Sequence, residues 1–438
     1  MKKNNFLKPP DKIKHIDTVI LGAGLSGLSC AYHTGGSVFE KEKEIGGTCR
    51  TSRIKGYIFD YGIHVLHTKN KYVLGLLAKD KKLFLTQKKR SAWIYSRNIL
   101  TKYPFQVNTF GLPRHIVEEC IIGFRDAQKK PRNNPLNYRE WIYATFGKGI
   151  ADNFYIPYSE KFWTVKTKEL TTDWLDVRVP RPSLSQVIAG ARSIQKEEFG
   201  PNALFHYPRS QGIQRITEAL LKPNTKIMLG KEAIKIEIDK KIIHFNNQTA
   251  VRYDKLISTI PLPELSKIIN VIPVAVRQAI QGLRCNSVLC VNLGIRREDI
   301  TSKHWIYFPE EKFAAFRISF PKNFSQLTVP KGWSSIQAEI AYSESRPVRY
   351  RDIAGKVIQD LIKARIISSR DQVKLINLHD IKYAYCLYDH GRLSNLDIIN
   401  RFLHKNHIYT AGRYGKWEYL WMDEAILSGK NVLKEMAR

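Results

Sequence analysis

Hydrophobic positions follow three different patterns along this chain. Short continuous apolar runs, which are typical of strands buried on both faces, occur near its start, in its middle and near its end. They lie at residues 18–21, 38–39, 253–260 and 408–413. Between residues 104 and 200 the apolar positions recur every three to four residues, a spacing that predicts helices. Between residues 285 and 345 apolar and polar residues alternate, which predicts antiparallel strands.

The order of these patterns predicts an α/β fold built from three units. A discontinuous Rossmann-like unit is expected from residues 14–100, 201–275 and 375–438. Residues 101–200 are expected to form a helical insertion, and residues 276–374 an antiparallel β-sheet that serves as the substrate domain. Individual helices are expected at residues 212–221, at 352–366 and from about Asp423, and individual strands at 92–95 and 234–238.

A glycine-rich turn follows the first apolar run. Its glycines are Gly22, Gly24 and Gly27 in the form Gly-x-Gly-x-x-Gly, and a segment with a helical pattern comes after it. Such a strand, turn and helix bind the pyrophosphate of a dinucleotide, because the backbone can approach the phosphates and the helix start offers free N–H groups. The second apolar run ends at Glu40, where a carboxylate is expected to bind the ribose hydroxyls.

The residues after Glu40 indicate which dinucleotide is bound. An acidic residue, a short spacer and the pair Gly46-Gly47 resemble the FAD enzymes of the amine-oxidase and sugar-mutase superfamily more than NAD dehydrogenases. The Rossmann-like unit is therefore expected to be an FAD domain, although a glycine-rich turn in an unrelated α/β domain is the alternative. The cofactor-binding residues implied by this resemblance are Gly22, Gly24, Leu25, Ser26, Gly27, Glu40, Lys41, Gly47, Thr48, Gly62, His64, Ala233, Gly412, Arg413 and Asp423.

The net charge bears on the partners of the protein. Lysine and arginine number 71 against 40 acidic residues, which gives a formal net charge of +31. Short basic clusters occur at residues 79–82, 88–90 and 129–132, but no nucleic-acid-binding motif accompanies them, so nucleic acid is not expected as a partner. A lysine-rich solvated surface is the first interpretation. An anionic substrate, or peripheral contact with an anionic membrane, is the second.

Other compositional signals exclude several classes of protein. An apolar run of about 18 residues is absent, so no membrane-spanning helix is expected. Residues 1–10 are basic and lack the apolar centre of a signal peptide, which makes the cytoplasm the expected location. Six cysteines without a C-x-x-C pair, and histidines without an H-x-x-x-H pair, predict neither a disulfide framework nor a metal site. The oligomeric state is left open.

Several longer blocks resemble the UDP-galactopyranose mutase family, particularly its eukaryotic type. They follow the family's order and lie at residues 103–106, 141–154, 157–163, 305–310 and 412–419. The resemblance implies an isomerase that interconverts UDP-galactopyranose and UDP-galactofuranose for cell-surface glycans. It also implies that FAD is active in its reduced form, with the flavin N5 as nucleophile at the anomeric carbon, and that NAD(P)H or another reductant supplies the electrons.

The same resemblance assigns roles to individual residues. The implied catalytic residues are Arg317, Arg413 and His64. The implied substrate-binding residues are Tyr103, Gln106, Trp305, Tyr307, Arg317, Arg413 and Tyr419. Arginine forks fit the oxygens of a diphosphate, and aromatic rings stack on uracil. Each residue also has a purely structural interpretation: His64 as a core histidine, the aromatic residues as sheet or loop packing, and the arginines as surface cations.

Four single positions differ from the family pattern, and so does the segment after Tyr419, where residues 420–424 replace the family's asparagine and glutamine near the flavin. Ile156 stands where an arginine is expected, Phe324 where a tyrosine, Ser183 where an asparagine and Ile63 where a second glycine is expected. These differences make a different sugar nucleotide an open alternative. An FAD oxidoreductase of the amine-oxidase, protoporphyrinogen-oxidase or desaturase type is the alternative function. A non-enzymatic protein that binds nucleotides or anionic surfaces is the third hypothesis.

Overall fold

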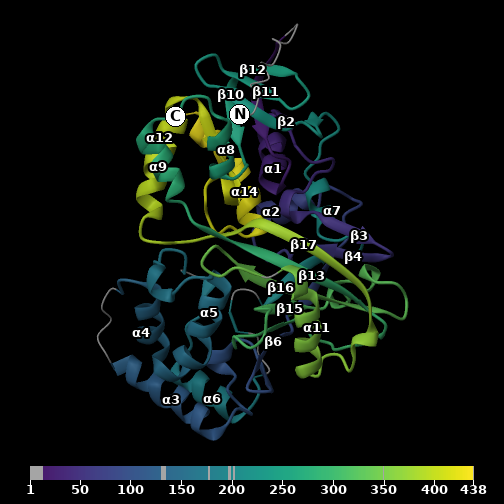
Figure 1. Cartoon of the computed structure of the whole chain (residues 1–438), viewed down its shortest axis with the longest axis vertical. Coiled ribbons are helices and arrows are strands. Elements are labelled where there is room, and N and C mark those ends of the chain that lie inside the picture. The colour runs from purple at the N-terminus through teal and green to yellow at the C-terminus, as the bar shows by residue number, and fades with distance from the viewer. Residues whose placement is uncertain are drawn as a thin grey trace.

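The computed structural model describes residues 13–129, 135–175, 178–195, 199–200, 203–348 and 350–437. The basic residues 1–10, and Lys130 and Arg132 of the third basic cluster, lie outside the described residues. Figure 1 shows three regions: a sheet with helices on both sides at the top, a helical region at the lower left and a second sheet at the lower right. This mixed architecture confirms the predicted fold class.

The upper sheet collects strands from the start, middle and end of the chain. Its order is β10-β11-β12-β1-β2-β9, with β18 beside β12. The strands are β1 (Lys14–Leu21), β2 (Ser37–Phe39), β9 (Ile227–Met228), β10 (Ala233–Glu237), β11 (Ile242–Phe245), β12 (Ala250–Ser258) and β18 (Ile408–Thr410). The central pairs are parallel, whereas β11 pairs antiparallel with both β10 and β12. The unit is therefore discontinuous, as the sequence predicted.

Helices cover both faces of this sheet, which explains its continuous apolar runs. Ile20 of β1 belongs to the buried cluster that contains residues of α1 (Leu25–Thr34) and α14 (Met422–Met436). Its neighbours Val19 and Leu21 point the other way, into the cluster with α8 (Leu262–Ile268), α9 (Val274–Gln281) and α12 (Arg392–Lys405). A strand buried on both faces needs an apolar residue at every position.

The helical region has a core of its own. Its helices are α3 (Arg114–Lys129), α4 (Tyr138–Ile150), α5 (Ile156–Trp163) and α6 (Leu184–Arg192), and a π-helical turn at Ala151–Tyr155 joins α4 to α5. The side chains that recur at helical spacing, such as Ile116, Phe124, Phe146 and Trp163, pack together there. The helical pattern predicted for this part of the chain is thus confirmed.

The second sheet includes strands from outside residues 285–345, the stretch in which alternating residues predicted antiparallel strands. Its order is β17-β13-β16-β15-β14-β6-β7. The strands are β6 (Ala92–Ser96), β7 (Ile99–Lys102), β13 (Cys285–Ile295), β14 (Trp305–Tyr307), β15 (Arg317–Ser319), β16 (Ser334–Tyr342) and β17 (Val373–Cys386). Helix α11 (Ile353–Lys363) packs on one face of it. The sheet is antiparallel except that β14 pairs parallel with β6, so it crosses the boundaries expected at residues 100 and 375. Strand partners this distant are chosen by tertiary packing, which local patterns do not encode.

Shorter elements complete the structure. They are β3 (Thr51–Ile54), β4 (Tyr57–Asp60), β5 (Leu85–Lys89), β8 (Leu204–Pro208), α2 (Lys71–Leu77), α7 (Gln214–Glu218), α10 (Pro321–Phe324) and α13 (Gly412–Gly415). Two expected elements are shorter than predicted. The last strand ends at Thr410 because Gly412, at φ +79°, turns the chain into α13, and the helix expected at 212–221 is limited to α7.

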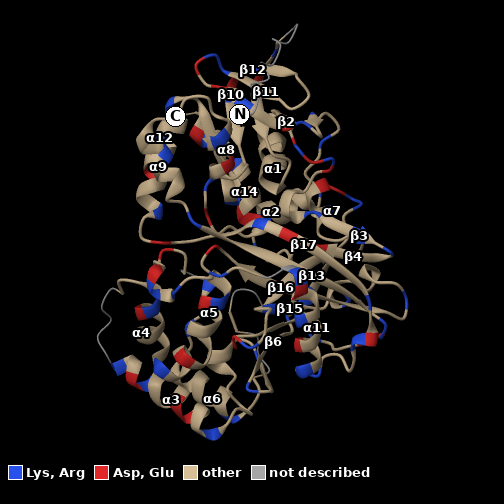
Figure 2. Cartoon of the chain, viewed as in Figure 1, with Lys and Arg blue, Asp and Glu red and all other residues tan. Residues whose placement is uncertain are grey.

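Charged side chains are spread over all three regions. Figure 2 shows lysine and arginine on every region, with acidic residues interspersed. Among the helices that the structure describes, none combines the length and the apolar character needed to cross a bilayer.

Candidate active site

The glycine-rich turn joins β1 to α1 at the edge of the upper sheet. A Cβ atom on Gly27 would lie 1.9 Å from the Gly22 carbonyl oxygen, so only glycine lets α1 pack this closely on the turn. The second glycine pair lies against the first turn, since a Cβ on Gly47 would lie 3.0 Å from the Gly24 Cα. The N-terminus of α1 and this close backbone form a cradle that fits a dinucleotide pyrophosphate.

Glu40 is fixed at the end of β2 beside this cradle. Its side chain is buried, and its two carboxylate oxygens accept hydrogen bonds from the backbone N–H groups of Ala23 (2.6 Å) and Glu42 (2.9 Å). Lys41 and Ala233 line the same crevice. We call this part of the site, lined by Gly22, Gly24, Glu40, Lys41 and Ala233, the dinucleotide end.

One cavity of about 890 Å³ runs from the dinucleotide end to the space between the helical region and the second sheet. We call its far part the substrate end, and it is lined by Tyr103, Tyr158, Trp305, Tyr307, Arg317, Tyr385, Arg413 and Tyr419. Most residues predicted from the sequence lie in the wall of this single cavity. Those from the prediction are Gly22, Gly24, Leu25, Ser26, Glu40, Lys41, Gly47, Thr48, Gly62, His64, Tyr103, Ala233, Trp305, Tyr307, Arg317, Gly412, Arg413 and Tyr419.

Three predicted residues are not among those that line the cavity. Gly27 is in α1, where it supports the turn rather than facing the cavity. Gln106 is fully buried, and its side-chain amide donates to the Pro180 carbonyl oxygen at 2.9 Å. Asp423 is in the first turn of α14, and its carboxylate accepts from the Glu424 backbone N–H at 2.9 Å.

His64 follows β4 and enters the cavity after Gly62, whose φ is +79°. Burial, together with the nearby positive charge of Arg413, lowers the pKa of His64 to about 4. Its ring is therefore neutral at physiological pH. Within the described part of the chain, the buried Nδ1 atom has no hydrogen-bond partner, so it can still bond to a bound ligand.

Arg317 is held rigidly in the second sheet by a buried carboxylate. Arg317 and Glu339 lie opposite each other on β15 and β16. The Arg317 Nη2 donates to Glu339 Oε1 at 3.0 Å, and its Nε donates to Oε2 at 2.5 Å. Glu339 also accepts from the Ile63 backbone N–H at 3.2 Å. This bidentate pair fixes both the guanidinium and the segment that carries His64.

Arg413 has hydrogen-bonding capacity that the protein leaves unused. Its guanidinium lies 4.8 Å from the ring centres of both Tyr385 and Tyr419, and one Nη donates to the Leu420 carbonyl oxygen at 3.2 Å. Its buried Nε and second Nη have no partner among the described residues. Two N–H donors on a desolvated cation are a strong site for an anionic oxygen.

Sequence reasoning missed Arg178, which lines the cavity with the predicted Arg317 and Arg413. Arg178 donates to the Tyr419 carbonyl oxygen at 2.7 Å and pairs with Glu424, and its guanidinium lies 4.8 Å from the Trp421 ring centre. It lies between α5 and α6 in a segment without a clear hydrophobic pattern, so no local signal identified it. Tyr385 of β17 also lines the cavity and was not predicted. Its signal in the sequence is that Tyr383 and Tyr385 are two residues apart on one strand, so both side chains lie on the same face.

Aromatic side chains form the remaining wall of the substrate end. The Tyr103 and Tyr307 ring centres are 5.0 Å apart, and Tyr158 meets Tyr307 edge-on at 5.3 Å. Tyr158 lies in a block that resembled the mutases, but it was given no role. Trp305 lies in the same wall, and its buried Nε1 has no partner in the ranges that the structure covers. The wall offers flat surfaces for a base and a free donor.

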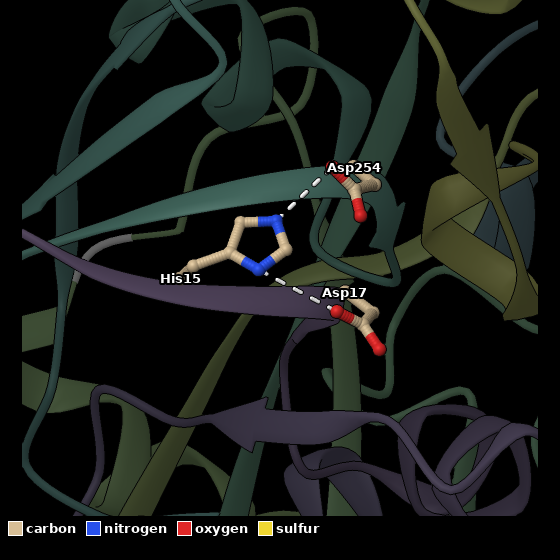
Figure 3. Close-up of side chains that lie close together, drawn as sticks. All are labelled: His15, Asp17 and Asp254. Atoms are coloured by element: carbon tan, nitrogen blue, oxygen red, sulfur yellow. Dashed lines mark hydrogen bonds and ion pairs between the residues drawn. The ribbon is translucent and has the colours of Figure 1, made fainter.

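A separate cluster of His15, Asp17 and Asp254 lies on β1 and β12, away from the cavity (Figure 3). The two ring nitrogens of His15 face carboxylate oxygens, Nδ1 at 3.5 Å from Asp17 and Nε2 at 3.1 Å from Asp254. All three side chains are more than half exposed to solvent. The cluster is an exposed ion-pair group, and it gives no support to a metal site.

Comparison with known proteins identifies the cofactor. A sequence model of the flavin containing amine oxidoreductases matches residues 25–318, more than half of the chain. The L-amino-acid oxidase of Crotalus adamanteus is 31% identical over 166 residues, which cover 36% of this chain and 32% of the oxidase. L-amino-acid oxidase apoxin-1 of Crotalus atrox matches to the same extent. The match thus spans about a third of the length of these curated relatives.

Two solved structures extend the comparison over the whole chain. A reduced UDP-galactopyranose mutase superposes with a TM-score of 0.90 at 26% identity, covering 96% of this chain and 95% of the mutase. Putrescine oxidase bound to putrescine superposes with a TM-score of 0.65 at 14% identity, covering 98% of this chain and 100% of the oxidase, which shows a shared fold. The family model and the mutase both indicate FAD, and the cradle fits it. FAD is therefore the cofactor of this chain.

Proposed function

This chain belongs to the flavin containing amine oxidoreductase family, and from that premise we propose that it is a sugar-nucleotide mutase. Its proposed substrates are UDP-galactopyranose and UDP-galactofuranose, which it would interconvert with FAD in the reduced form. The likeness to a UDP-galactopyranose mutase over 96% of the chain supports this proposal.

The observation that carries the proposal is the unpaired guanidinium of Arg413. The buried Nε and second Nη of this cation have no partner among the described residues, so they suit an anionic ligand. Arg317 and Arg178 line the same cavity, each already paired with a carboxylate, Glu339 and Glu424 respectively. A diphosphate has two phosphate groups and many oxygens, so it can accept from Arg413 and from a remaining N–H group of Arg317 at the same time.

The side chains of the substrate end can perform the binding and electrostatic parts of such a reaction. Reduced FAD, when bound, supplies a nucleophilic nitrogen for the anomeric carbon of the sugar. Arg413 and Arg317 would donate to the diphosphate oxygens, on which negative charge grows as the sugar–oxygen bond breaks. Tyr103 and Tyr307 would provide stacking surfaces for the uracil, and neutral His64 adds no competing charge beside the arginines.

An FAD oxidoreductase acting on an amine or amino acid is the second candidate. The oxidases named above match the chain in sequence, and the free donors of Arg413 could equally bind the α-carboxylate of an amino acid. In that case the aromatic wall of Tyr385 and Tyr419 would enclose the substrate's side chain rather than a nucleotide.

One assay distinguishes the two candidates. Purified holoenzyme is reduced with dithionite under anaerobic conditions, UDP-galactopyranose or UDP-galactofuranose is added, and the nucleotides are separated by chromatography. The mutase proposal predicts interconversion in the reduced sample and none in an oxidised sample handled identically. UDP-glucose serves as the matched control for the sugar.

The same preparations are tested for oxidase activity in air. L-leucine and putrescine are added to the oxidised protein, and hydrogen peroxide is measured. Peroxide formation without any conversion of the UDP-sugars would overturn the mutase proposal in favour of the oxidoreductase. Equal conversion with and without dithionite would contradict the requirement for reduced FAD.

A further inference from the structure

Lys161 is a buried lysine whose ammonium group has three hydrogen-bond partners. It lies on α5 and is 1% exposed. Its Nζ donates to the carbonyl oxygens of Phe308 (2.9 Å), Glu310 (2.9 Å) and Ala315 (2.7 Å). An ammonium group has three N–H donors, so each is matched by one carbonyl. A lysine this buried is unusual unless its charge is compensated.

The three carbonyl oxygens belong to the segment that joins β14 to β15. These two strands carry Trp305, Tyr307 and Arg317 into the substrate end. Helix α5 carries Tyr158 into the same cavity, only three residues before Lys161. Lys161 therefore connects the helical wall of the substrate end to its sheet wall.

Aromatic contacts near Lys161 also join the helical wall to the sheet wall. The Tyr158 ring meets Tyr307 edge-on at 5.3 Å and lies 6.4 Å from the ring of Phe316, the residue after Ala315. Helix α11 holds the same joining segment from the other side, because the Asp360 carboxylate accepts from the Ala314 backbone N–H at 2.8 Å. The segment is thus held between two helices.

We propose that Lys161 is a positioning residue that fixes Tyr158 on α5 against Tyr307 and Arg317 on the β14–β15 hairpin, and so sets the geometry of the substrate end. That the ligand is a UDP-sugar rests on the proposed function. The connection between the two walls rests instead on the hydrogen bonds of Lys161. Lys161 touches no reacting group, and it acts through the residues that line the cavity.

The charge state of Lys161 gives this role a pH dependence. Burial lowers the pKa of Lys161 to about 7, Glu311 and Asp360 favour its ammonium form, and Arg346 and Lys356 oppose it. A neutral amine has only two N–H groups and would turn its lone pair toward a carbonyl oxygen. The link between the walls therefore weakens as the pH rises above about 7.

Lys161→Met tests the role, because methionine keeps the unbranched shape and removes all three donors. In the FAD-loaded enzyme we expect UDP to bind about tenfold more weakly and kcat to fall about tenfold, since small displacements of positioning groups have effects of this size. FAD affinity should stay unchanged, because the dinucleotide end is untouched. The wild type should lose UDP affinity above pH 7, whereas the variant should not.

Lys166→Met is the matched control. Lys166 lies just after α5, is 67% exposed and pairs with Glu160, so the same substitution there removes a lysine without touching the hairpin. Lys161→Arg keeps the charge, but its planar fork cannot converge on three carbonyl oxygens, and it serves if the methionine variant fails to fold. Native UDP affinity, kcat and pH profile in either folded Lys161 variant would overturn the proposal.

Failure of the proposed function is recognised separately. If the wild-type enzyme binds no UDP, the proposed function fails, and hydrogen exchange of residues 305–317 in the holoenzyme becomes the readout. At least tenfold faster exchange there in Lys161→Met, but not in Lys166→Met, supports the connection. Unchanged exchange overturns it.

Discussion

The two ends of the cavity are built in different ways. The dinucleotide end is made largely of backbone: a glycine turn, a helix N-terminus and one carboxylate within residues 22–40, with Lys41 and Ala233 beside them. The substrate end is made of side chains from the helical region, the second sheet and the segment before α14. A backbone site binds what every member of a large superfamily shares. A side-chain site can change its ligand through a few substitutions.

The comparisons agree on the cofactor, whereas the proteins that they name differ in their reactions. The family model covers residues 25–318, which include residues of both ends. The mutase and the putrescine oxidase each superpose over nearly the whole chain, the mutase with the higher TM-score. Substitutions at the two ends should therefore have different effects, the loss of FAD at one end and the loss of turnover at the other.

The dinucleotide end should tolerate no side chain at Gly27. In Gly27→Ala the new Cβ would lie 1.9 Å from the Gly22 carbonyl oxygen, a backbone atom that cannot move without opening the turn. We expect loss of bound FAD, measured by the flavin absorbance of the purified protein. Gly75→Ala on α2 is the control, since nothing lies within 4 Å of its Cβ position. A yellow Gly27→Ala protein would show that the turn does not determine FAD binding.

The substrate end should lose activity while FAD stays bound. Removing a desolvated donor that stabilises developing charge costs roughly a hundredfold to a thousandfold in turnover, so Arg413→Ala should reduce kcat by that much. Arg401→Ala, an exposed arginine on α12 that pairs with Asp397, is the control. Steady-state kinetics of UDP-sugar conversion check this. Near-normal kcat in a flavin-loaded Arg413→Ala enzyme would remove Arg413 from the mechanism.

Acid should destabilise the folded protein through the buried His64 of the cavity. The pKa of His64 is lowered to about 4 in the folded protein from about 6.5, so the unfolded state binds its proton first as the pH falls. The free energy of unfolding should therefore decrease between pH 6.5 and 4, by about 3 kcal/mol for this residue. Urea unfolding of wild type and His64→Gln at several pH values measures it. An equal pH dependence in both proteins would contradict the assignment.

The sequence signals of the dinucleotide end are local, and the structure places the residues that carry them in the wall of one cavity. Gly22, Gly24 and Glu40 lie within one strand–turn–helix–strand unit, whose spacing follows from the geometry of the backbone. Gly27 does not line the cavity, but it allows the close packing of α1 that its place in the motif predicts.

The substrate end depended on contacts between distant segments, which no local pattern encodes. Glu339 was not recognised, since it is one polar position in an alternating strand and gains its role only opposite Arg317. Arg178 was missed because its partners, Tyr419 and Glu424, lie more than 200 residues away. Tyr103 and Tyr307 were found through a family resemblance rather than through hydrophobic periodicity.

The central claim is that the substrate end binds a nucleoside diphosphate, and calorimetric titration of the FAD-loaded protein with UDP tests it most directly. The account predicts one UDP per chain, with an affinity that falls as salt is added and falls at least tenfold in Arg413→Ala but not in Arg401→Ala. Absence of UDP binding, together with binding of an amino acid or amine at the same site, would contradict it.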